Sequence, residues 1–300
     1  MRPGIIRLLY MVTDITEEDQ ARIDLSQVGI RRGSYMIDGT LLLVGRHTNG
    51  SSQALEVHAE RLRDRDIAAS VRVAHYDRTH AIDGDGTALS KTGALDDGEV
   101  FLLPVLMTNT RGAEHAVRAI ATSIPNSVCV CDPIGRVPAV SRLLLERAAE
   151  TAQPTEDTAL VLVGFGSGSA PGSRETLKYH ERRLRKRSDY ADVRSCYLLQ
   201  DPAAECVRYN VSRRRMVVVP AFVSPGPAIR TEIRAKIRDD RGRVAYAEPI
   251  GTHSLLTDAM YAAVAKQYIV NTRDGDVPPP PTTVGGPRGR VDADGGQIPD

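Results

Sequence analysis

The feature that most constrains the fold of this 300-residue chain is a long internal repeat. One copy begins with GTLLLVGRHTNGSSQALEVHAERLRDR at residue 39, and the other begins with TALVLVGFGSGSAPGSRETLKYHERRLRKR at residue 158. In each copy an apolar run is followed by glycine and small polar residues, and then by apolar residues at helical spacing. This pattern is typical of a strand, a loop and a helix. The duplication therefore predicts two similar halves.

The two copies continue in the same order. Next come SVRVAHYD and DVRSCYLL, and then the apolar runs VFLLP and MVVVP, whose proline marks where a strand leaves its sheet. Each copy closes with a strand and the phrase DPIG or EPIG ahead of a last helix. Alternating helices and near-continuous apolar strands predict an α/β fold, with a three-layer α/β/α unit built on a parallel sheet and present twice in tandem.

These patterns divide the chain into four parts. We expect repeat 1 at 40–150 and repeat 2 at 158–268, with the loop ends of both facing one cleft. Residues 1–39 form an N-terminal extension, in which IIRLLYMV has the composition of an extra strand. Residues 271–300 contain four consecutive prolines and many glycines in a polar background, which predicts a disordered tail.

Composition narrows the class of partner. The formal net charge is +1, so the chain lacks the overall basic field of a nucleic-acid-binding protein. The four cysteines are too few for a secreted disulfide scaffold, and no apolar run is long enough to span a membrane. We therefore expect a cytoplasmic protein that binds a small molecule, with neither nucleic acid nor membrane as a partner.

Candidate ligand-binding residues follow the strands. In open α/β sheets ligands bind beyond the carboxyl ends of the strands, where loops vary and helix N-termini point inward. The polar and aromatic residues that we expect there are Arg46, His47, Arg111, His115 and Asp132 in the first copy, and Phe165, Ser167, Glu248 and His253 in the second.

Three of these loops resemble the sirohydrochlorin chelatases. That family has a strand ending in V-G-H-G-S, a later strand followed by a loop glycine and a second histidine, and then a P-L-G turn before the last helix. The corresponding phrases here are VGRHT and VGFGS, then VLMTNTRGAEH and AFVSPGPA, and then DPIG and EPIG. Their order, found twice, extends the resemblance over most of the chain.

The resemblance implies insertion of a divalent ion, Co²⁺ or Fe²⁺, into a carboxylated tetrapyrrole bound in the cleft between the repeats. The metal would be a substrate, and no organic cofactor is implied. The family's first histidine position is held by Arg46, with His47 one place later, and in the second copy by Phe165. His115 matches the second histidine if its loop has gained one residue. The resemblance therefore implies His47 and His115 as the catalytic, metal-binding pair, since neutral imidazole ligates divalent ions and accepts protons.

Other residues are expected to contact the substrate. An arginine fork binds a carboxylate through two donors but accepts no proton at neutral pH, so Arg46 and Arg111 fit carboxylate clamps. Asp132 and Glu248 either orient a ligand histidine or bond local turn amides. His47 and His115 have a plainer interpretation as polar residues of a loop and of a helix start.

Other motifs leave alternatives open. The GFGSGS loop either cradles a phosphate or only allows a sharp turn. The run ERRLRKR is interpreted as a solvated helix face. The replaced family histidines favour a second hypothesis, in which a divergent chain either catalyses a different reaction on a small acidic substrate in specialised metabolism or carries a tetrapyrrole or metal without catalysis.

Overall fold

The computed structural model describes residues 36–47, 51–76, 95, 98–108, 110–166, 171–211, 213–223, 226–239 and 241–274. The strand expected within IIRLLYMV lies outside these residues, as does the tail beyond residue 274. No helix in the described ranges is both long and apolar enough to cross a membrane.

Two four-stranded sheets form the framework, and every strand pairing in both is parallel. This confirms the predicted α/β class with parallel sheets. The matching strand orders, β2-β1-β3-β4 and β6-β5-β7-β8, are consistent with the predicted repeat. The strands of the first sheet are β1 (Ile37–Arg46), β2 (Ala68–Tyr76), β3 (Glu99–Pro104) and β4 (Val128–Val130), and those of the second are β5 (Thr158–Gly164), β6 (Asp192–Tyr197), β7 (Arg215–Pro220) and β8 (Val244–Tyr246).

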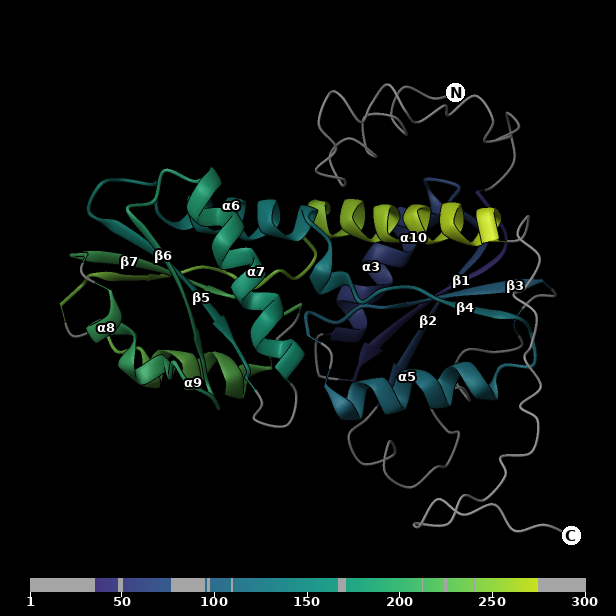
Figure 1. Ribbon diagram of the computed structural model, residues 1–300, viewed down its shortest axis with the longest axis horizontal. Coiled ribbons are helices and arrows are strands. Elements are labelled where there is room, and N and C mark those ends of the chain that lie inside the picture. Colours follow the sequence, from purple (N-terminus) through teal and green to yellow (C-terminus); the bar gives the residue numbers. More distant parts are fainter. Residues whose placement is uncertain are drawn as a thin grey trace, which may run out of the picture.

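Each half has a helix after its first strand, a helix after its third strand and a closing helix. These are α3 (Ser51–Arg63), α5 (Arg111–Ser123) and α6 (Ala139–Thr151), then α7 (Pro171–Arg187), α9 (Pro227–Lys236) and α10 (Ser254–Asp274). The closing helices are exchanged between the halves: α6 packs on α7 and β7 of the second sheet, and α10 packs on α3 and β3 of the first (Figure 1). The described residues also contain the short helices η3 (Ile134–Arg136), η4 (Ala204–Cys206) and α8 (Val207–Asn210).

The exchange gives the molecule a shared core. Alternate residues of each central strand face opposite sides of its sheet, so Leu41 and Leu43 join one cluster while Leu42 and Val44 join another. The cluster around Leu41 also contains Leu160 of the second sheet and residues of all four helices α3, α6, α7 and α10. The halves are therefore joined by continuous apolar packing, which is the main stabilising contribution available to a fold of this size.

A buried histidine fastens α10 to the first half. His58 on α3 is fully buried; its Nε2 lies 3.1 Å from the carbonyl oxygen of Gly251, and its Nδ1 lies 2.8 Å from Thr257 Oγ1. Because a carbonyl oxygen can only accept, Nε2 carries the proton, and Nδ1 of the neutral ring accepts from the hydroxyl. Burial lowers the pKa of His58, which favours this neutral form.

The second half contains the equivalent contact. His180 on α7 is fully buried; its Nε2 lies 2.7 Å from the carbonyl oxygen of Gly135, and its Nδ1 lies 2.7 Å from Ser141 Oγ on α6. Burial lowers the pKa of His180 to about 4, so this ring is also neutral. Each histidine thus binds the closing segment that the other half contributes.

The last helix reaches further than the sequence predicted. α10 continues to Asp274, four residues into the segment expected to be disordered. Asn271 donates from Nδ2 to Glu99 Oε1 of the first sheet at 2.8 Å. This contact joins residues that are 172 positions apart in the chain, so composition alone could not indicate it.

Candidate functional site

The carboxyl edge of the first sheet brings two imidazoles together. His47 follows β1 and is exposed, and His75 is half-buried near the end of the neighbouring strand β2. Their ring centres lie 5.9 Å apart, with the ring planes at 85°. The backbone N–H of His47 donates to the carbonyl oxygen of Tyr76 at 2.8 Å, which extends the ladder and fixes the start of the loop. Two groups that can ligate a divalent ion or accept a proton therefore stand side by side.

Arg46 adds a permanent positive charge at the same edge. It is the last residue of β1, is exposed, and is paired in register with Tyr76. Burial raises the pKa of the Tyr76 hydroxyl, and the Arg46 guanidinium opposes this shift. The two side chains therefore interact electrostatically across the strand ends, and Arg46 lies where a substrate carboxylate could be bound beside His47.

Arg111 and His115 lie in the first two turns of α5, the helix that follows β3. The strand β3 pairs with β1 on the side opposite β2, and α5 follows it. Thr110 caps this helix, since its hydroxyl oxygen accepts the backbone N–H of Ala113 at 3.2 Å. Arg111 and His115 are exposed on the first two turns. The structure places His47 beside His75, and the pairing of His47 with His115 stays a prediction.

The two acids ahead of Pro-Ile-Gly form exposed ion pairs. Asp132 Oδ2 lies 3.2 Å from Lys266 Nζ on α10, and Glu248 Oε2 lies 3.3 Å from Arg230 Nη1 on α9. Each acid therefore contacts a cation of a neighbouring helix. Neither of the two roles considered from the sequence includes this contact.

In the second half the position that corresponds to His47 has no room for an imidazole. Phe165 takes the place of Arg46, is half-buried and packs against the apolar cluster of the second sheet. Gly166 takes the place of His47 with φ +75°, and a Cβ there would lie 2.8 Å from Cβ atoms of Tyr197 and Gln200. Any side chain would be strained at this position. Ser167, the remaining predicted contact, lies outside the described residues.

His253 contacts the exchanged helix α6. Its Nε2 lies 3.5 Å from Glu150 Oε1 and 3.7 Å from Glu146 Oε2, while its Nδ1 accepts the backbone N–H of Leu255 at 3.2 Å. The imidazole side chain is only 12% exposed. These contacts give His253 a part in joining α6 to α10, and its predicted contact with substrate stays a prediction.

The described residues contain no group of three or more His, Cys, Asp or Glu side chains arranged to hold a metal ion. Cys131 is buried in the core shared by the halves, and burial raises the pKa of its thiol. Because the thiolate is the reactive form, this cysteine is suited to packing. The first sheet edge therefore offers two histidines, and any further metal ligands would come from the substrate or from other residues.

Sequence reasoning missed three of the histidines that the structure makes prominent. A signal existed for two of them, since His58 and His180 occupy the same place in HAERLRDR and HERRLRKR. His75 gave no such signal, because the second copy has Tyr197 at the equivalent position.

Comparison with known proteins gives concordant results. Residues 159–267 match the CbiX protein-family model. The chain is 23% identical over 210 residues to a probable sirohydrochlorin cobaltochelatase of Halobacterium salinarum, a match covering 61% of this chain and 70% of that protein.

Two solved structures have a similar fold. SirB from Bacillus subtilis, determined with Fe³⁺, superimposes with a TM-score of 0.61 at 18% identity, over 80% of this chain and 98% of that one. A multi-domain protein of Deinococcus radiodurans, described as structurally similar to chelatases, gives a TM-score of 0.60 at 18% identity over 76% of this chain. The match covers 55% of the D. radiodurans protein, which has two additional domains.

Proposed function

This chain is a member of the sirohydrochlorin chelatase family, and from that premise we propose that it inserts a divalent metal ion into a carboxylated tetrapyrrole. The observation that most supports this proposal is the pair His47 and His75 at the carboxyl edge of the first sheet, with Arg46 beside them. The named relatives suggest cobalt or iron as the metal substrate.

Metal insertion requires the macrocycle to lose two pyrrole protons as the metal enters. An exposed imidazole accepts a proton in its neutral form and ligates a divalent ion through the same lone pair. In the proposed mechanism His47, the more exposed of the pair, presents the metal or removes a pyrrole proton. His75 lies at the edge of the His47 ring and takes the other role, and solvent water accepts the second pyrrole proton.

Substrate orientation is assigned to the arginines. Each guanidinium presents a rigid fork of donors that matches a carboxylate, and its charge does not titrate at neutral pH. Arg46 at the end of β1 and Arg111 at the start of α5 lie on adjoining segments of the same sheet edge. We assign them to two peripheral carboxylates of the macrocycle, with His115 one turn beyond Arg111 as a further candidate for the metal.

The test is the metal-dependent absorbance change of sirohydrochlorin with Co²⁺ or Fe²⁺, measured with the full chain. We expect insertion faster than the spontaneous reaction, and a loss of about 100-fold in His47→Ala, in line with the usual contribution of a general base. His75→Ala and His115→Ala show which imidazole is its partner. Arg118→Gln, an exposed arginine on the same helix, is the matched control for Arg111→Gln.

The rate and the binding of sirohydrochlorin together decide between the two hypotheses. Acceleration that survives His47→Ala would exclude the assigned role of His47. Tight binding of sirohydrochlorin or metal without acceleration would support the non-catalytic carrier instead. The observation that favours this second candidate is that the described residues offer no complete metal-ligand group.

A further inference from the structure

A pocket lies at the open edge of the second sheet, beside the edge strand β6. Its volume is about 470 Å³, within the usual range for sites that bind small molecules. It is enclosed by α7, the edge strand β6 and the segment that follows this strand. The lining residues are Lys178, Glu181, Arg194, Ser195, Cys196, Pro202, Val207, Tyr209 and Asn210.

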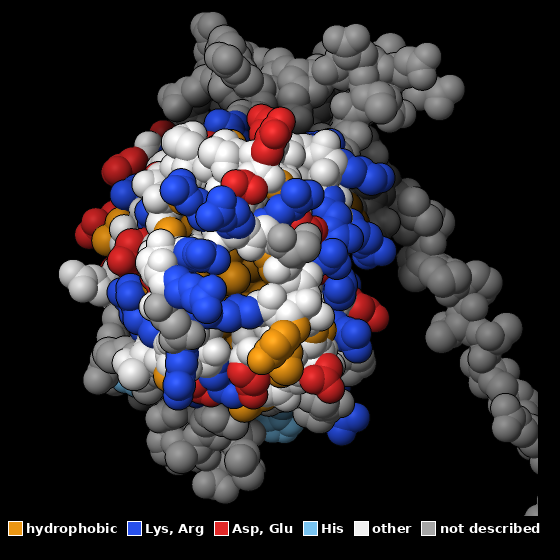
Figure 2. All heavy atoms as spheres, turned by 90° about the vertical axis from the view of Figure 1, so that its left-hand side faces the viewer, with side chains coloured by type: hydrophobic (Ala, Val, Ile, Leu, Met, Phe, Trp, Pro, Cys, Tyr) orange, Lys and Arg blue, Asp and Glu red, His pale blue; other side chains and the backbone are white. Residues whose placement is uncertain are grey.

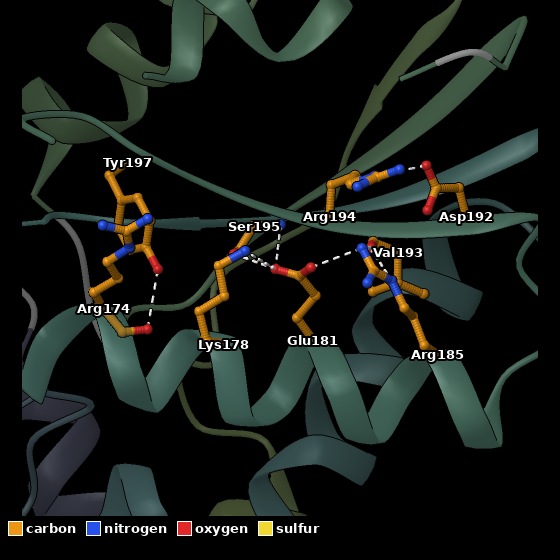
Figure 3. A network of polar contacts seen from close by, with 9 residues as sticks. All are labelled: Arg174, Lys178, Glu181, Arg185, Asp192, Val193, Arg194, Ser195 and Tyr197. Atoms are coloured by element: carbon orange, nitrogen blue, oxygen red, sulfur yellow. Dashed lines mark hydrogen bonds and ion pairs between the residues drawn. The ribbon is translucent and has the colours of Figure 1, made fainter. Parts of the chain in front are cut away.

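One wall of this pocket is held by a buried carboxylate that accepts from four donor groups. Glu181 is 3% exposed and accepts from the backbone N–H of Ser195 at 3.1 Å, from the Ser195 hydroxyl, from Lys178 Nζ at 3.1 Å and from Arg185 Nη2 at 2.7 Å (Figure 3). Four donors on one carboxylate neutralise its charge and hold Lys178 in place. Glu181 therefore positions a cation at the pocket and leaves no net negative charge of its own.

Lys178 and Arg194 have further N–H groups that can donate to a ligand in the pocket. The ammonium of Lys178 has three N–H groups, of which one is directed to Glu181. Arg194 donates Nε–H to Asp192 at 2.8 Å, which anchors the guanidinium while its terminal N–H groups are directed elsewhere (Figure 3). Both side chains are held by carboxylates, so they lose little freedom when an anion binds.

The surrounding surface attracts anions. Residues 171–243 include 18 Lys and Arg against 9 Asp and Glu, although the whole chain has a net charge of +1. Figure 2 shows the end of the molecule formed by the second half, where Lys and Arg side chains gather around small apolar areas. A local positive potential of this kind raises the concentration of anions near a pocket.

The remaining wall is apolar and aromatic. Val207 and Cys196 are buried and form a hydrophobic side, while the ring of Tyr209 is 90% exposed. An exposed ring beside a pocket gains from stacking against a flat ligand, which removes apolar surface from water.

We propose that this pocket binds a small organic anion with a flat apolar body, separately from the tetrapyrrole at the first sheet edge. Lys178 and Arg194 bind the anionic group, and Val207 and Tyr209 contact the body. The proposal is independent of chelation, because it concerns the opposite half of the molecule and its test measures binding alone.

The probe is anilinonaphthalene sulfonate, a flat aromatic anion whose fluorescence rises when it leaves water. We expect saturable binding to the native full chain with one site. Lys178→Gln and Arg194→Gln should each weaken it about tenfold, the usual loss for one charge-assisted hydrogen bond. Lys186→Gln on the same helix and Arg238→Gln on the same basic segment are the matched controls, and both should bind as the native chain does.

Tyr209→Ala keeps the test decisive if Lys178→Gln disturbs folding, since a residue so exposed contributes little to the core. We expect weaker probe binding in this variant as well. Displacement of the probe by benzoate and by phenyl phosphate distinguishes carboxylate from phosphate ligands. Benzyl alcohol, which has no charge, is the control for binding of the aromatic ring alone. An absence of saturable binding, equal affinities in the lining and control variants, or displacement by benzyl alcohol as effective as by benzoate would overturn the proposal.

Discussion

His58 and His180 occupy corresponding positions in the two halves, and each bonds a glycine carbonyl and a hydroxyl in the closing segment of the other half. The first sheet edge and its counterpart differ, since Arg46 and His47 are matched by Phe165 and Gly166. These two histidine contacts between the halves are therefore the same in both, whereas the proposed ligand-binding edges differ. This difference is why we assign metal insertion to the first half.

The edge strands β2 and β6 also have different side-chain surroundings in the two halves. Glu181 and the Ser195 that it binds correspond to Ala59 and Val73 in the first half, an apolar pair. The second half thus has a buried carboxylate where the first has Ala59 and, beside it, a pocket with cationic donors. A chain with two similar halves can use one for a reaction and the other for separate binding, because function depends on local sites.

The largest expected effect separates two equivalent glycines. A Cβ on Gly135 would lie 1.9 Å from the carbonyl oxygen of Met107. A Cβ on Gly251 would lie 3.6 Å from the carbonyl oxygen of Pro249, an ordinary contact distance, so the cost there comes only from φ +55°. We expect Gly135→Ala to lower the free energy of unfolding by about 5 kcal/mol and Gly251→Ala by about 1 to 2 kcal/mol. Urea denaturation of both variants measures this; equal losses would show that the two glycines are not packed differently.

Removing the carboxylate of the second half should have the next largest effect. Glu181→Ala leaves the buried N–H and hydroxyl of Ser195 without this acceptor and removes the carboxylate that pairs with Lys178 and Arg185, so we expect a loss of about 4 kcal/mol in unfolding free energy. Glu181→Ala with Ser195→Val recreates the apolar pair of the first half and should recover about 1 kcal/mol by removing the unpaired hydroxyl. If the double variant is no more stable than Glu181→Ala, the hydroxyl is not a source of the loss.

Much of the fold could be predicted from the sequence because its signals are local. Continuous apolar runs such as Leu41–Val44 and Val217–Val219 predict buried parallel strands, and both lie at the centres of their sheets. The exchange of α6 and α10 could not be predicted in this way. An amphipathic pattern shows that a helix buries one face, but it does not show which sheet covers that face.

The candidate site was predicted only in part. His47 follows a strand, so its place at the sheet edge follows from topology alone. His75 lies within β2, where a strand pattern gives no reason to expect a site residue, and its closeness to His47 comes from strand pairing. Asp132 and His253 bond Lys266 and Glu150, which are more than 100 positions away in the chain, so their partners depend on the exchange of closing helices.

The buried histidines predict a dependence of stability on pH. Because burial lowers the pKa of His180 from 6.5 to about 4, the unfolded chain binds a proton between these values that the folded chain does not. The stabilising contribution is therefore complete above pH 6.5 and is lost as the pH falls towards 4, by about 3 kcal/mol for His180. His58, whose pKa is also lowered, should add a loss in the same direction.

Unfolding free energies measured by urea denaturation at pH 7 and pH 5 test this dependence. His180→Gln and His58→Gln should each be less stable at pH 7 and should show a smaller change between the two pH values than the native chain. A native stability that does not change over this interval would mean that neither ring stays neutral through burial.

The smallest expected effect concerns the arginines that cover the two open edges. Arg63 donates Nε–H and Nη2–H to the carbonyl oxygen of Val71, and Arg185 donates the same two groups to that of Val193. A lysine cannot supply this fork, so Arg63→Lys should cost about 1 kcal/mol in unfolding free energy. Arg185→Lys should cost more, because Arg185 also pairs with buried Glu181 at 2.7 Å. In the Glu181→Ala background that contact is absent, and Arg63 has in addition only a long, exposed contact with Glu56 at 3.9 Å, so the two lysine variants should become nearly equal. A difference as large as in the native background would mean that the buried carboxylate is not what distinguishes the two edges.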